Sequence, residues 1–276
     1  MSTSIPGSTR LQFDTVVARL RAAGCVFAED EARLLVADAA TPAVLAAMVD
    51  RRAAGVPLEH ILGWAEFCGL RIAVDPGVFV PRRRTEFLVQ QAAALSKQSM
   101  GARSTPAGGP VVVDMCCGSG AVGVAVATAV GRSELHAADI DPAAVSCADR
   151  NLKTVGGRVY QGDLYAALPD SLRGRVDILV ANAPYVPTEE IGMMPPEARL
   201  FEPAVALDGG SDGLDLQRRV AAGAPGWLAP DGRLLIETSD RQALGTVDIF
   251  RRAGLGARLV SSDEWSATVV VGSQKI

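Results

Sequence analysis

Histidine and cysteine, the residues that most often hold transition metals, are too few and too widely spaced here to build a metal site. The two histidines, His60 and His136, have no metal-ligand partner at helical spacing, which favours packing or surface roles. The five cysteines are scattered and lack C-x-x-C spacing, a pattern typical of reduced thiols rather than of a disulfide framework or a zinc centre. The sequence therefore predicts no metal ion.

Long apolar runs and long basic runs are also missing. No apolar run is long enough to span a bilayer, and the N-terminus lacks the basic-then-apolar pattern of a signal peptide. The formal charge is −4 and the single basic cluster, Arg82-Arg83-Arg84, is short, so electrostatics do not favour binding to nucleic acid. We expect a cytoplasmic protein with no membrane contact and no stably bound nucleic acid.

The N-terminal part of the chain shows two successive patterns. Residues 11–54 are rich in Ala, Leu and Arg with helical periodicity, and Thr41-Pro42 is a typical helix start. We predict a small helical domain over residues 1–62. Residues 63–82 change character and predict a β connector of short strands joined by turns. The strands expected there are Phe67–Leu70, Arg71–Val74 and Val78–Val80.

After a predicted helix at residues 85–96 and a flexible loop at Gly101–Pro110, strands and helices alternate. Such alternation is typical of a parallel sheet with helices on both faces, and therefore of an α/β fold. Strands are predicted at Val111–Asp114, Leu135–Asp139, Arg158–Tyr160, Val176–Ala181, Arg233–Glu237 and Ala267–Val271, and helices at residues 120–130, 142–154, 212–222 and 241–252.

A short motif, Asn182-Ala183-Pro184-Tyr185, directly follows the apolar strand predicted at Val176–Ala181. The C-terminal edge of such a strand is where ligands bind in open α/β sheets. The side-chain oxygen of Asn182 and the carbonyl of Ala183 are two acceptors for both N–H bonds of an NH2 group, and Tyr185 offers a flat wall. An ordinary strand-to-loop exit is the alternative, because Asn and Pro are common turn residues.

A glycine-containing loop and three acids predict a nucleoside site near the same edge. Glycines let the backbone approach a ligand, and an acid that closes the next strand can accept both hydroxyls of a ribose. A phosphate-binding Lys-Ser/Thr pair is missing, and Cys116 stands where a dinucleotide fingerprint has its first glycine, so S-adenosylmethionine fits better than NAD. The predicted cofactor residues are Asp114, Cys116, Gly118, Gly120, Asp139 and Asp163.

Several motifs in register resemble the HemK/PrmC family of protein glutamine methyltransferases, from about residue 11 to the end. Asn182–Tyr185 is similar to the family's Asn-Pro-Pro-Tyr, and Val80-Pro81-Arg82 with Thr85-Glu86 is similar to its Pro-Arg-Pro-acid-Thr-Glu segment. Ala183 in place of a proline, and Arg83-Arg84 in place of a proline and an acid, depart from that pattern. Further similar segments are Gly55–Gly63, Asp114–Gly120, Asp139, Phe201–Pro203, Ala206–Leu214 and Leu235–Glu237.

The resemblance implies a Rossmann-like class I methyltransferase sheet at residues 83–276 that uses S-adenosyl-L-methionine, a β-hairpin connector, and a substrate-recognition domain at residues 1–62. The implied activity is methyl transfer to the side-chain amide nitrogen of a glutamine in a protein, with a release factor or ribosomal protein as the suspected partner. Catalytic roles carry over to Asn182, Ala183, Pro184 and Tyr185, and Asn182 also belongs to the implied cofactor site.

Two other functions stay open at this point. A nucleic-acid amino-methyltransferase could use the same acceptor pair on adenine, but it is expected to show a basic strip for phosphates, which the acidic balance argues against. A non-catalytic binding module is the other alternative, because Ala183 leaves the motif loop less stiff than a proline does. We expect Glu86 to pair with Arg82 or to face the cofactor, and Glu202 and Glu237 to be structural carboxylates.

Overall fold

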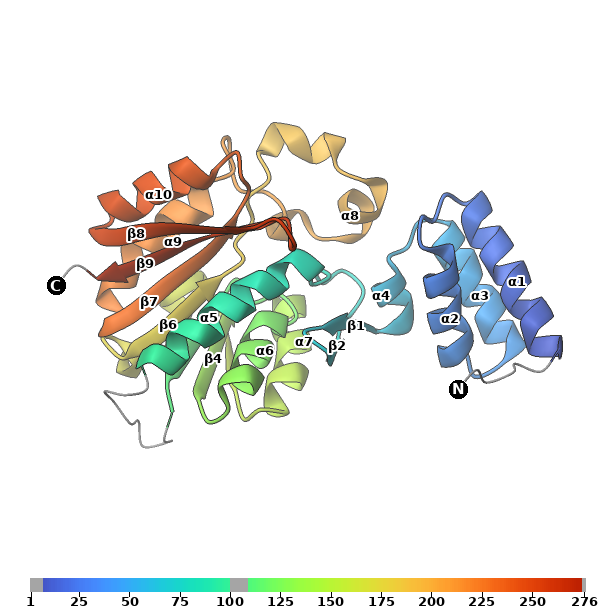
Figure 1. Ribbon diagram of the computed structural model, residues 1–276, viewed down its shortest axis with the longest axis horizontal. Coiled ribbons are helices and arrows are strands. Elements are labelled where there is room, and N and C mark those ends of the chain that lie inside the picture. Colours follow the sequence, from blue (N-terminus) through green and yellow to red (C-terminus); the bar gives the residue numbers. More distant parts are fainter. Residues whose placement is uncertain (1–6, 100–108, 275–276) are drawn as a thin grey trace.

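Four helices form the N-terminal end of the described chain and share an apolar core of their own (Figure 1). The computed structural model describes residues 7–99 and 109–274. Thr41 begins the third helix as predicted: its hydroxyl accepts a hydrogen bond from the backbone N–H of Val44 at 3.2 Å, and Pro42 follows in the first turn. The four helices are α1 (Gly7–Ala22), α2 (Ala28–Asp38), α3 (Pro42–Ala53) and α4 (Leu58–Leu62).

An antiparallel hairpin, β1 (Trp64–Phe67) and β2 (Leu70–Ala73), connects these helices to the rest of the chain. Cys68 and Gly69 form its turn with φ of 51° and 70°, the left-handed backbone that the commonest two-residue hairpin turn requires. The strand predicted at Phe67–Leu70 is therefore wrong, because the centre of that segment is the turn.

The chain after the hairpin is irregular where a third strand was predicted, at Val78–Val80. The backbone N–H of Val80 donates to a side-chain oxygen of Glu202 at 3.1 Å instead of to a neighbouring strand. His60 is buried, as expected of a packing residue, and its Nε2 lies 2.8 Å from the carbonyl oxygen of Val78. The apolar run does mark a buried segment, but one that packs as a loop.

In the described residues a seven-stranded sheet has the order β5-β4-β3-β6-β7-β9-β8 (Figure 1). The first five strands in this order run parallel, as predicted, but β9 is antiparallel to β7 and β8 is antiparallel to β9, so the prediction is wrong at this edge. β8 was not predicted, because its residues are mostly exposed or half-buried and offer no apolar run. The strands are β3 (Val111–Met115), β4 (Glu134–Asp139), β5 (Arg158–Gln161), β6 (Val176–Ala181), β7 (Leu228–Thr238), β8 (Leu255–Ser262) and β9 (Ala267–Gln274).

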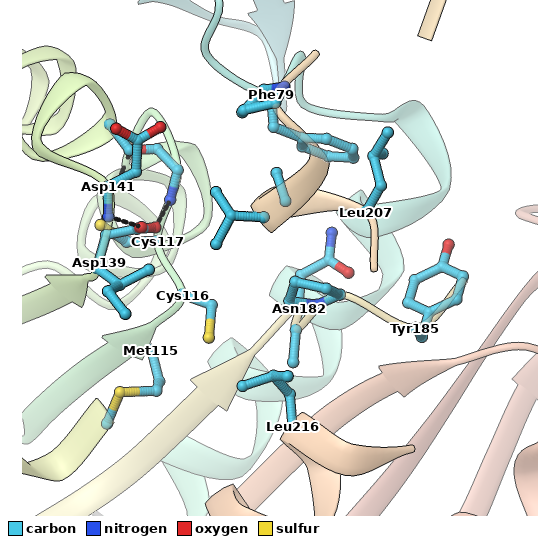
Figure 2. Close-up of a pocket in the computed structure, with 18 of the residues that line it drawn as sticks. Phe79, Met115, Cys116, Cys117, Asp139, Asp141, Asn182, Tyr185, Leu207 and Leu216 are labelled. Atoms are coloured by element: carbon cyan, nitrogen blue, oxygen red, sulfur yellow. Dashed lines mark hydrogen bonds between the residues drawn. The ribbon is translucent and has the colours of Figure 1, made fainter. Parts of the chain in front are cut away.

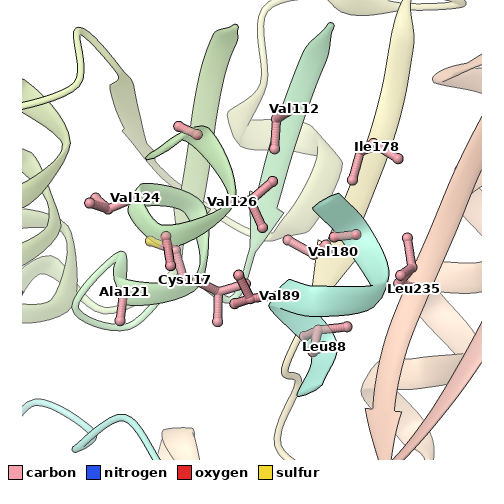
Figure 3. Close-up of a cluster of buried hydrophobic side chains, with 14 of the residues drawn as sticks. Leu88, Val89, Val112, Cys117, Ala121, Val124, Val126, Ile178, Val180 and Leu235 are labelled. Atoms are coloured by element: carbon pink, nitrogen blue, oxygen red, sulfur yellow. The ribbon is translucent and has the colours of Figure 1, made fainter. Parts of the chain in front are cut away.

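Helices cover both faces of this sheet, as predicted. On one face α5 and α6 pack against Val112 of β3 and against Ile178 and Val180 of β6 (Figure 3), and α7 packs on the same face over β4 and β5. On the other face α9 and α10 belong to a second apolar cluster, with the strand residues that alternate with those of the first face, such as Val113 and Leu179. Burying a side chain of this size contributes roughly 1.5–3 kcal/mol, so the strand alternation fixes the face that each helix covers. The helices are α5 (Glu86–Ser99), α6 (Ala121–Val130), α7 (Pro142–Lys153), α8 (Pro196–Phe201), α9 (Asp215–Gly223) and α10 (Ala243–Arg252).

Most predicted ends of these elements lie close to the observed ones. The start of α9 differs from the prediction, which placed Asp212 inside the helix. The carboxylate of Asp212 accepts a hydrogen bond from the N–H of Leu214 at 3.1 Å, so Asp212 belongs to the turn that precedes the helix. The loop predicted at Gly101–Pro110 lies almost entirely outside the described residues. Within residues 7–99 and 109–274, no helix has the length and apolar character needed to cross a bilayer.

Candidate active site

The carboxyl ends of β3, β4, β5 and β6 surround a cavity of about 570 Å³. The chain passes from β3 to β4 on one side and returns to β6 on the other, so the cavity lies where the strand order reverses. Open α/β sheets bind ligands at this position, and the volume is typical of a small-molecule site. The segments that line this edge include Met115–Ser119, Ala138–Asp141, Gly162–Leu164 and Asn182–Val186.

The loop after β3 has an unusual backbone beside the cavity. Cys116, Gly118 and Gly120 are all in left-handed conformation, with φ of 58°, 54° and 76°. A Cβ on Gly118 would meet only Phe79, at 4.0 Å, so a ligand can approach this backbone closely. Gly120 does not line the cavity: a Cβ there would lie 2.4 Å from Leu152 of α7, so this glycine is required for packing.

Asp139, at the end of β4, joins two loops of the cavity (Figure 2). Its Oδ2 accepts from the N–H of Gly118 at 2.8 Å and its Oδ1 accepts from the N–H of Asp141 at 3.0 Å. Burial raises the pKa of this carboxyl group, although the backbone donors oppose the rise. Each oxygen keeps a lone pair, so the group can still accept hydrogen bonds from the hydroxyls of a ribose.

The two other predicted acids differ in their surroundings. Asp114 of β3 is buried, and its Oδ2 accepts from the N–H of Gly123 in the first turn of α6 at 2.8 Å. Burial raises the pKa of Asp114 to about 8. Asp163 is half exposed, and its Oδ2 accepts from Arg219 of α9 at 2.6 Å. A ligand that reaches Asp163 must therefore share this carboxylate with an arginine.

The predicted acceptor motif follows β6 and lines the same cavity, with Asn182 between Cys116 and Tyr185 (Figure 2). The side-chain NH2 of Asn182 donates to the hydroxyl of Thr85 at 3.3 Å. Among the described residues, no donor bonds the Oδ1 of Asn182 or the carbonyl oxygen of Ala183. Ala183 is buried as a whole residue, and it lines the wall of the cavity.

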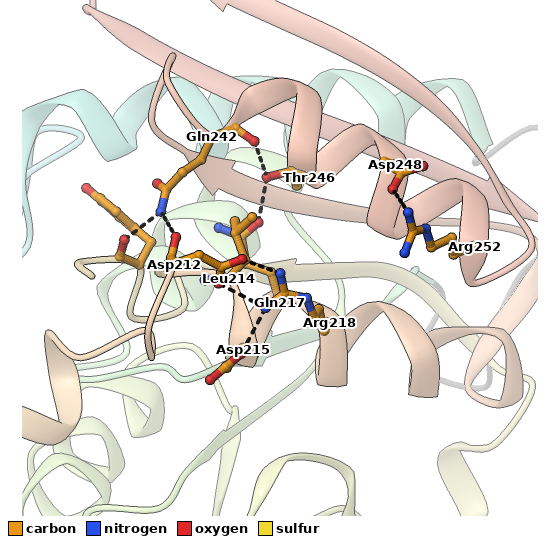
Figure 4. A network of polar contacts seen from close by, with 10 residues as sticks. Asp212, Leu214, Asp215, Gln217, Arg218, Gln242, Thr246, Asp248 and Arg252 are labelled. Atoms are coloured by element: carbon orange, nitrogen blue, oxygen red, sulfur yellow. Dashed lines mark hydrogen bonds and ion pairs between the residues drawn. The ribbon is translucent and has the colours of Figure 1, made fainter. Parts of the chain in front are cut away.

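Tyr185 is fixed at both ends. Its hydroxyl contacts the guanidinium of Arg84, which also lies over the ring at 5.6 Å from the ring centre. Its carbonyl oxygen accepts from Nε2 of Gln242 at 2.9 Å, and the same amide donates to the carbonyl of Asp212 at 3.0 Å (Figure 4). Burial raises the pKa of Tyr185 to about 12, and the nearby Glu237 adds to this rise. At neutral pH the ring is therefore an uncharged wall.

The basic cluster has specific partners. Arg82 pairs with the buried Glu202 at 2.6 Å, so neither of the two roles considered for Glu86 holds: it does not pair with Arg82 and does not line the cavity. Arg83 lies over the ring of Trp265 in the turn between β8 and β9. Arg82 and Arg84 line the cavity and Arg83 does not, so two of the three arginines belong to the wall of the site.

Comparison with curated proteins decides the family. A protein of Geobacter sulfurreducens named release factor glutamine methyltransferase is 37% identical over 229 residues, which cover 82% of this chain and 76% of that protein. This chain belongs to the release factor glutamine methyltransferase family. A family model described as methyltransferase small domain also matches residues 70–206.

Two further matches bear on the acceptor and on the fold of this family member. A protein of Streptomyces pristinaespiralis named 4-amino-L-phenylalanine/4-methylamino-L-phenylalanine methyltransferase is 38% identical over 208 residues, 75% of this chain and 69% of that protein. The crystal structure of a methyltransferase from Pyrococcus furiosus aligns with a TM-score of 0.54 over 75% of this chain and 90% of that chain. At 15% identity the latter shows the fold alone, which confirms the predicted methyltransferase fold.

The residues of the cavity fit S-adenosyl-L-methionine, the cofactor of this methyltransferase family. The carboxylates of Asp114, Asp139 and Asp163 all line the cavity, and acids suit a ligand with a ribose, an ammonium and a sulfonium. The accessible backbone of Gly118 allows close contact with the chain of such a ligand. Bound there, the cofactor supplies a methyl group on a positively charged sulfur.

Several residues that line this cavity were not predicted from the sequence, among them Phe79, Leu216 and Arg219. Phe79 was assigned to a strand, yet it lines the cavity as a half-buried side chain between two buried valines. Arg219 and Leu216 come from α9, whose position depends on long-range packing. The apolar–aromatic–apolar order around Phe79 was the only local signal that could have indicated its role.

Proposed function

We propose that this protein transfers a methyl group from S-adenosyl-L-methionine to the side-chain amide nitrogen of a glutamine in a release factor. The observation that carries the proposal is a pair of unused acceptor oxygens, on the side chain of Asn182 and the backbone of Ala183, in the same cavity as the carboxylate of Asp139. Family membership supports it, because the Geobacter sulfurreducens relative carries this name.

The chemistry needs orientation more than activation. An amide nitrogen is a poor nucleophile, because its lone pair is delocalised into the carbonyl group. The oxygens of Asn182 and Ala183 accept its two N–H bonds, while Pro184 and Tyr185 form a wall beside the amide. Holding the nitrogen in line with the methyl group in this way is worth about 7–11 kcal/mol of the barrier.

The same two oxygens act on the charge that develops during transfer. As the new N–C bond forms, the bond between the methyl group and the sulfur would break and the positive charge would pass to the nitrogen. The protons on the nitrogen become acidic, so acceptor oxygens already aimed at them stabilise the transition state. One of these protons would then leave to water. No strong base is required before transfer. Ala183 lines the same cavity as Asn182, which supports this role.

Asn182→Ala should nearly abolish methyl transfer while the Kd for S-adenosylmethionine changes little, because the side chain holds the acceptor. Asp139→Ala should do the reverse and weaken cofactor binding first, by about tenfold or more for the loss of hydrogen bonds to a charged acceptor. Calorimetry gives the affinity, and transfer of a tritiated methyl group gives the rate. Near-normal turnover of Asn182→Ala would remove this residue from the acceptor site.

The acceptor class can be decided in the same assay. Purified release factors, ribosomal proteins and RNA are offered separately to the enzyme with labelled cofactor. We expect label in a release factor, on a glutamine located by mass spectrometry. Label in RNA alone supports a nucleic-acid amino-methyltransferase, and cofactor binding with no acceptor supports a non-catalytic module.

A small aromatic amine is the second candidate acceptor, favoured by the Streptomyces pristinaespiralis relative. The amino group of an aniline ring is planar, like that of an amide, and offers two N–H bonds to the same pair of oxygens. Phe79 and Tyr185 line the cavity and suit an aromatic ring. Transfer to 4-amino-L-phenylalanine with a higher kcat/KM than to any release factor would favour this candidate.

The helices of residues 1–62 remain predicted as the region that recognises the protein acceptor. Val26 and Phe27, at the turn before α2, are 83% and 69% exposed, more than such side chains usually are. If this surface receives a protein, Phe27→Ser should raise KM for the protein acceptor several-fold and leave kcat and the cofactor Kd unchanged. An unchanged KM would exclude this surface.

A further inference from the structure

Glu237, at the end of β7, is a buried carboxylate that has no use in the mechanism above. Its side chain is 2% exposed, and among the described side chains whose oxygens are buried it is the one carboxylate with no hydrogen bond of full geometry on either oxygen. Its near neighbours are the Nε of Arg84, 3.4 Å from Oε1, and the hydroxyl of Thr85. Burial raises the pKa of Glu237, while Thr85 and Arg84 oppose that rise.

Thr85 stands between this carboxylate and the acceptor site. Its side chain is buried, and its oxygen accepts a hydrogen bond from the NH2 of Asn182 at 3.3 Å. A hydroxyl has one hydrogen to donate in addition to the lone pairs on which it accepts. The hydrogen of Thr85 is therefore free to point at Glu237, which accepts hydrogen bonds and donates none when it is ionised.

The orientation of the Asn182 amide depends on this arrangement. Rotating the amide by half a turn exchanges its oxygen and nitrogen, and the flipped form would present N–H donors to the N–H bonds of the substrate. A threonine alone does not prevent the flip, because a hydroxyl can accept from an NH2 or donate to an oxygen. An ionised carboxylate that takes the threonine hydrogen leaves the hydroxyl only as an acceptor, which selects one orientation.

We propose that Thr85 and Glu237 are positioning residues that hold the amide of Asn182 with its oxygen toward the acceptor substrate. The inference rests on the proposed function, since it concerns how that acceptor is held. Glu237 does not line the cavity, so it acts through Thr85 and not on the substrate. Arg84 has a supporting role: its guanidinium favours the ionised form of Glu237 and also contacts the hydroxyl of Tyr185.

Two substitutions of Thr85 test the hydroxyl directly. Thr85→Val keeps the shape and removes the hydroxyl, so kcat for methyl transfer should fall about 100-fold, the size of effect that a small misplacement of a reacting group produces. The Kd for S-adenosylmethionine should not change. Thr85→Ser restores the hydroxyl and should keep most of the wild-type kcat, which a purely structural role of the threonine methyl group would not predict.

Thr268→Val is the matched control. Thr268 is also a buried threonine, and its hydroxyl bonds the side chains of Asp240 and Ser261, away from the site. This variant should keep the wild-type kcat, even if its stability falls as much as that of Thr85→Val. Equal loss of kcat in both variants would show that any buried threonine has this effect and would overturn the proposal.

A double-variant comparison tests the link to Glu237. Glu237→Gln puts a group that both donates and accepts beside Thr85, so it should lower kcat in the wild-type background. It should have almost no further effect in Thr85→Val, because coupled residues are not additive. An equal loss in both backgrounds would show that Glu237 acts through Arg84 and Tyr185, and would overturn the proposal.

A measurement without turnover separates this inference from the proposed function. In protein labelled with ¹⁵N-asparagine, the side-chain NH2 signal of Asn182, assigned by its loss in Asn182→Ala, should exchange slowly with water in the wild type and in Thr85→Ser. The exchange should be fast in Thr85→Val. If the wild-type enzyme methylates no glutamine, the proposed function fails while this result still supports the amide anchor; slow exchange in Thr85→Val overturns it.

Discussion

Acids of the same chemical type titrate differently at this site because their surroundings differ. Asp139 receives backbone donors from Gly118 and Asp141, which favour its ionised form, whereas Asp114 is more deeply buried and receives one from Gly123. The pKa of Asp114 is accordingly raised to about 8 by burial. At pH 7 this group is mostly neutral when no cation lies beside it.

The affinity for S-adenosylmethionine should therefore depend on pH through Asp114. A ligand cation favours the ionised carboxylate, so binding releases a proton, and the affinity rises with pH until about 8, by at most about tenfold for each pH unit. Between pH 5.5 and 7 the ammonium of the ligand stays protonated, at about 7.7–8.0 for an α-amino group, so the slope belongs to the protein. Calorimetry in two buffers of different ionisation enthalpy counts the released protons.

Asp114→Asn is the control for this titration, because it removes the proton and keeps the shape. It should bind the cofactor with an affinity that changes less between pH 5.5 and 7. An affinity of the wild type that is constant over this range, or a slope that the variant retains, would exclude Asp114 as the titrating group. S-adenosylhomocysteine keeps the ammonium and lacks the sulfonium, so it shows which charge the carboxylate meets.

At the residue scale, the sequence predicted groups that are close to one another along the chain. Asn182 to Tyr185 form one continuous motif at a strand end, and the structure places all four on the cavity. The anchor of Asn182 could not be predicted, because Thr85 lies 97 residues before it in the chain and Glu237 lies 55 residues after it. Contacts of this kind depend on how β6, β7 and α5 pack.

At the element scale, α6 depends on a glycine at its first boundary. Gly120 has a φ of 76°, and a Cβ there would lie 2.4 Å from Leu152 of α7. Gly120→Ala should lower the free energy of unfolding by about 1–2 kcal/mol for the left-handed backbone and by a further ~1–3 kcal/mol for the clash. Urea unfolding followed by circular dichroism measures the difference.

Gly156→Ala separates the cost of the left-handed backbone from the cost of the steric clash. Gly156 also has a positive φ, 71°, but a Cβ there would meet no atom within 4 Å. This variant should lose only the backbone term of about 1–2 kcal/mol. If the two variants are equally destabilised, the close packing between the loop after β3 and α7 makes no difference to stability.

Elements with a strong periodic pattern were predicted well, and those defined by exposed residues were not. The boundaries of β6 match the prediction, because an apolar run that only Asp177 interrupts marks a strand buried along most of its length. β8 lies at the edge of the sheet with many exposed residues, so its sequence resembles a loop. The turn at Cys68-Gly69 was missed because a cysteine rarely adopts a positive φ.

At the scale of the whole molecule, the site is closed by segments that are distant in the chain. Arg82 comes from the segment after the hairpin and Glu202 from the loop after α8, and their ion pair joins the two at 2.6 Å. Val186 bonds Leu207 and Gly209 of the same later loop at 3.0 and 2.9 Å. The acceptor motif is therefore enclosed between two segments that the sequence alone does not bring together.

Breaking the Arg82–Glu202 pair should destabilise the protein in a pH-dependent way. Arg82→Met leaves the buried Glu202 without a counter-charge, which should cost about 2 kcal/mol at pH 8, less than the ~3–5 kcal/mol of a fully buried pair because Arg82 is 35% exposed. Burial already raises the pKa of Glu202, and Arg82 opposes that rise. Removing the arginine raises the pKa of Glu202 further. The free energy of unfolding of the variant therefore falls as the pH rises through this raised pKa.

The loss of stability of Arg82→Met relative to the wild type should therefore be small near pH 4, where Glu202 is largely protonated in both folded proteins. This loss should grow toward pH 8. Replacing both partners, as in Arg82→Met with Glu202→Gln, removes the buried charge, keeps an acceptor for the N–H of Val80 and should recover most of the lost stability. Urea unfolding of the three proteins at several pH values measures this. A deficit that does not change with pH, or a double variant less stable than Arg82→Met, would show that Arg82 stabilises the fold through its packing over Phe79 and not through its charge.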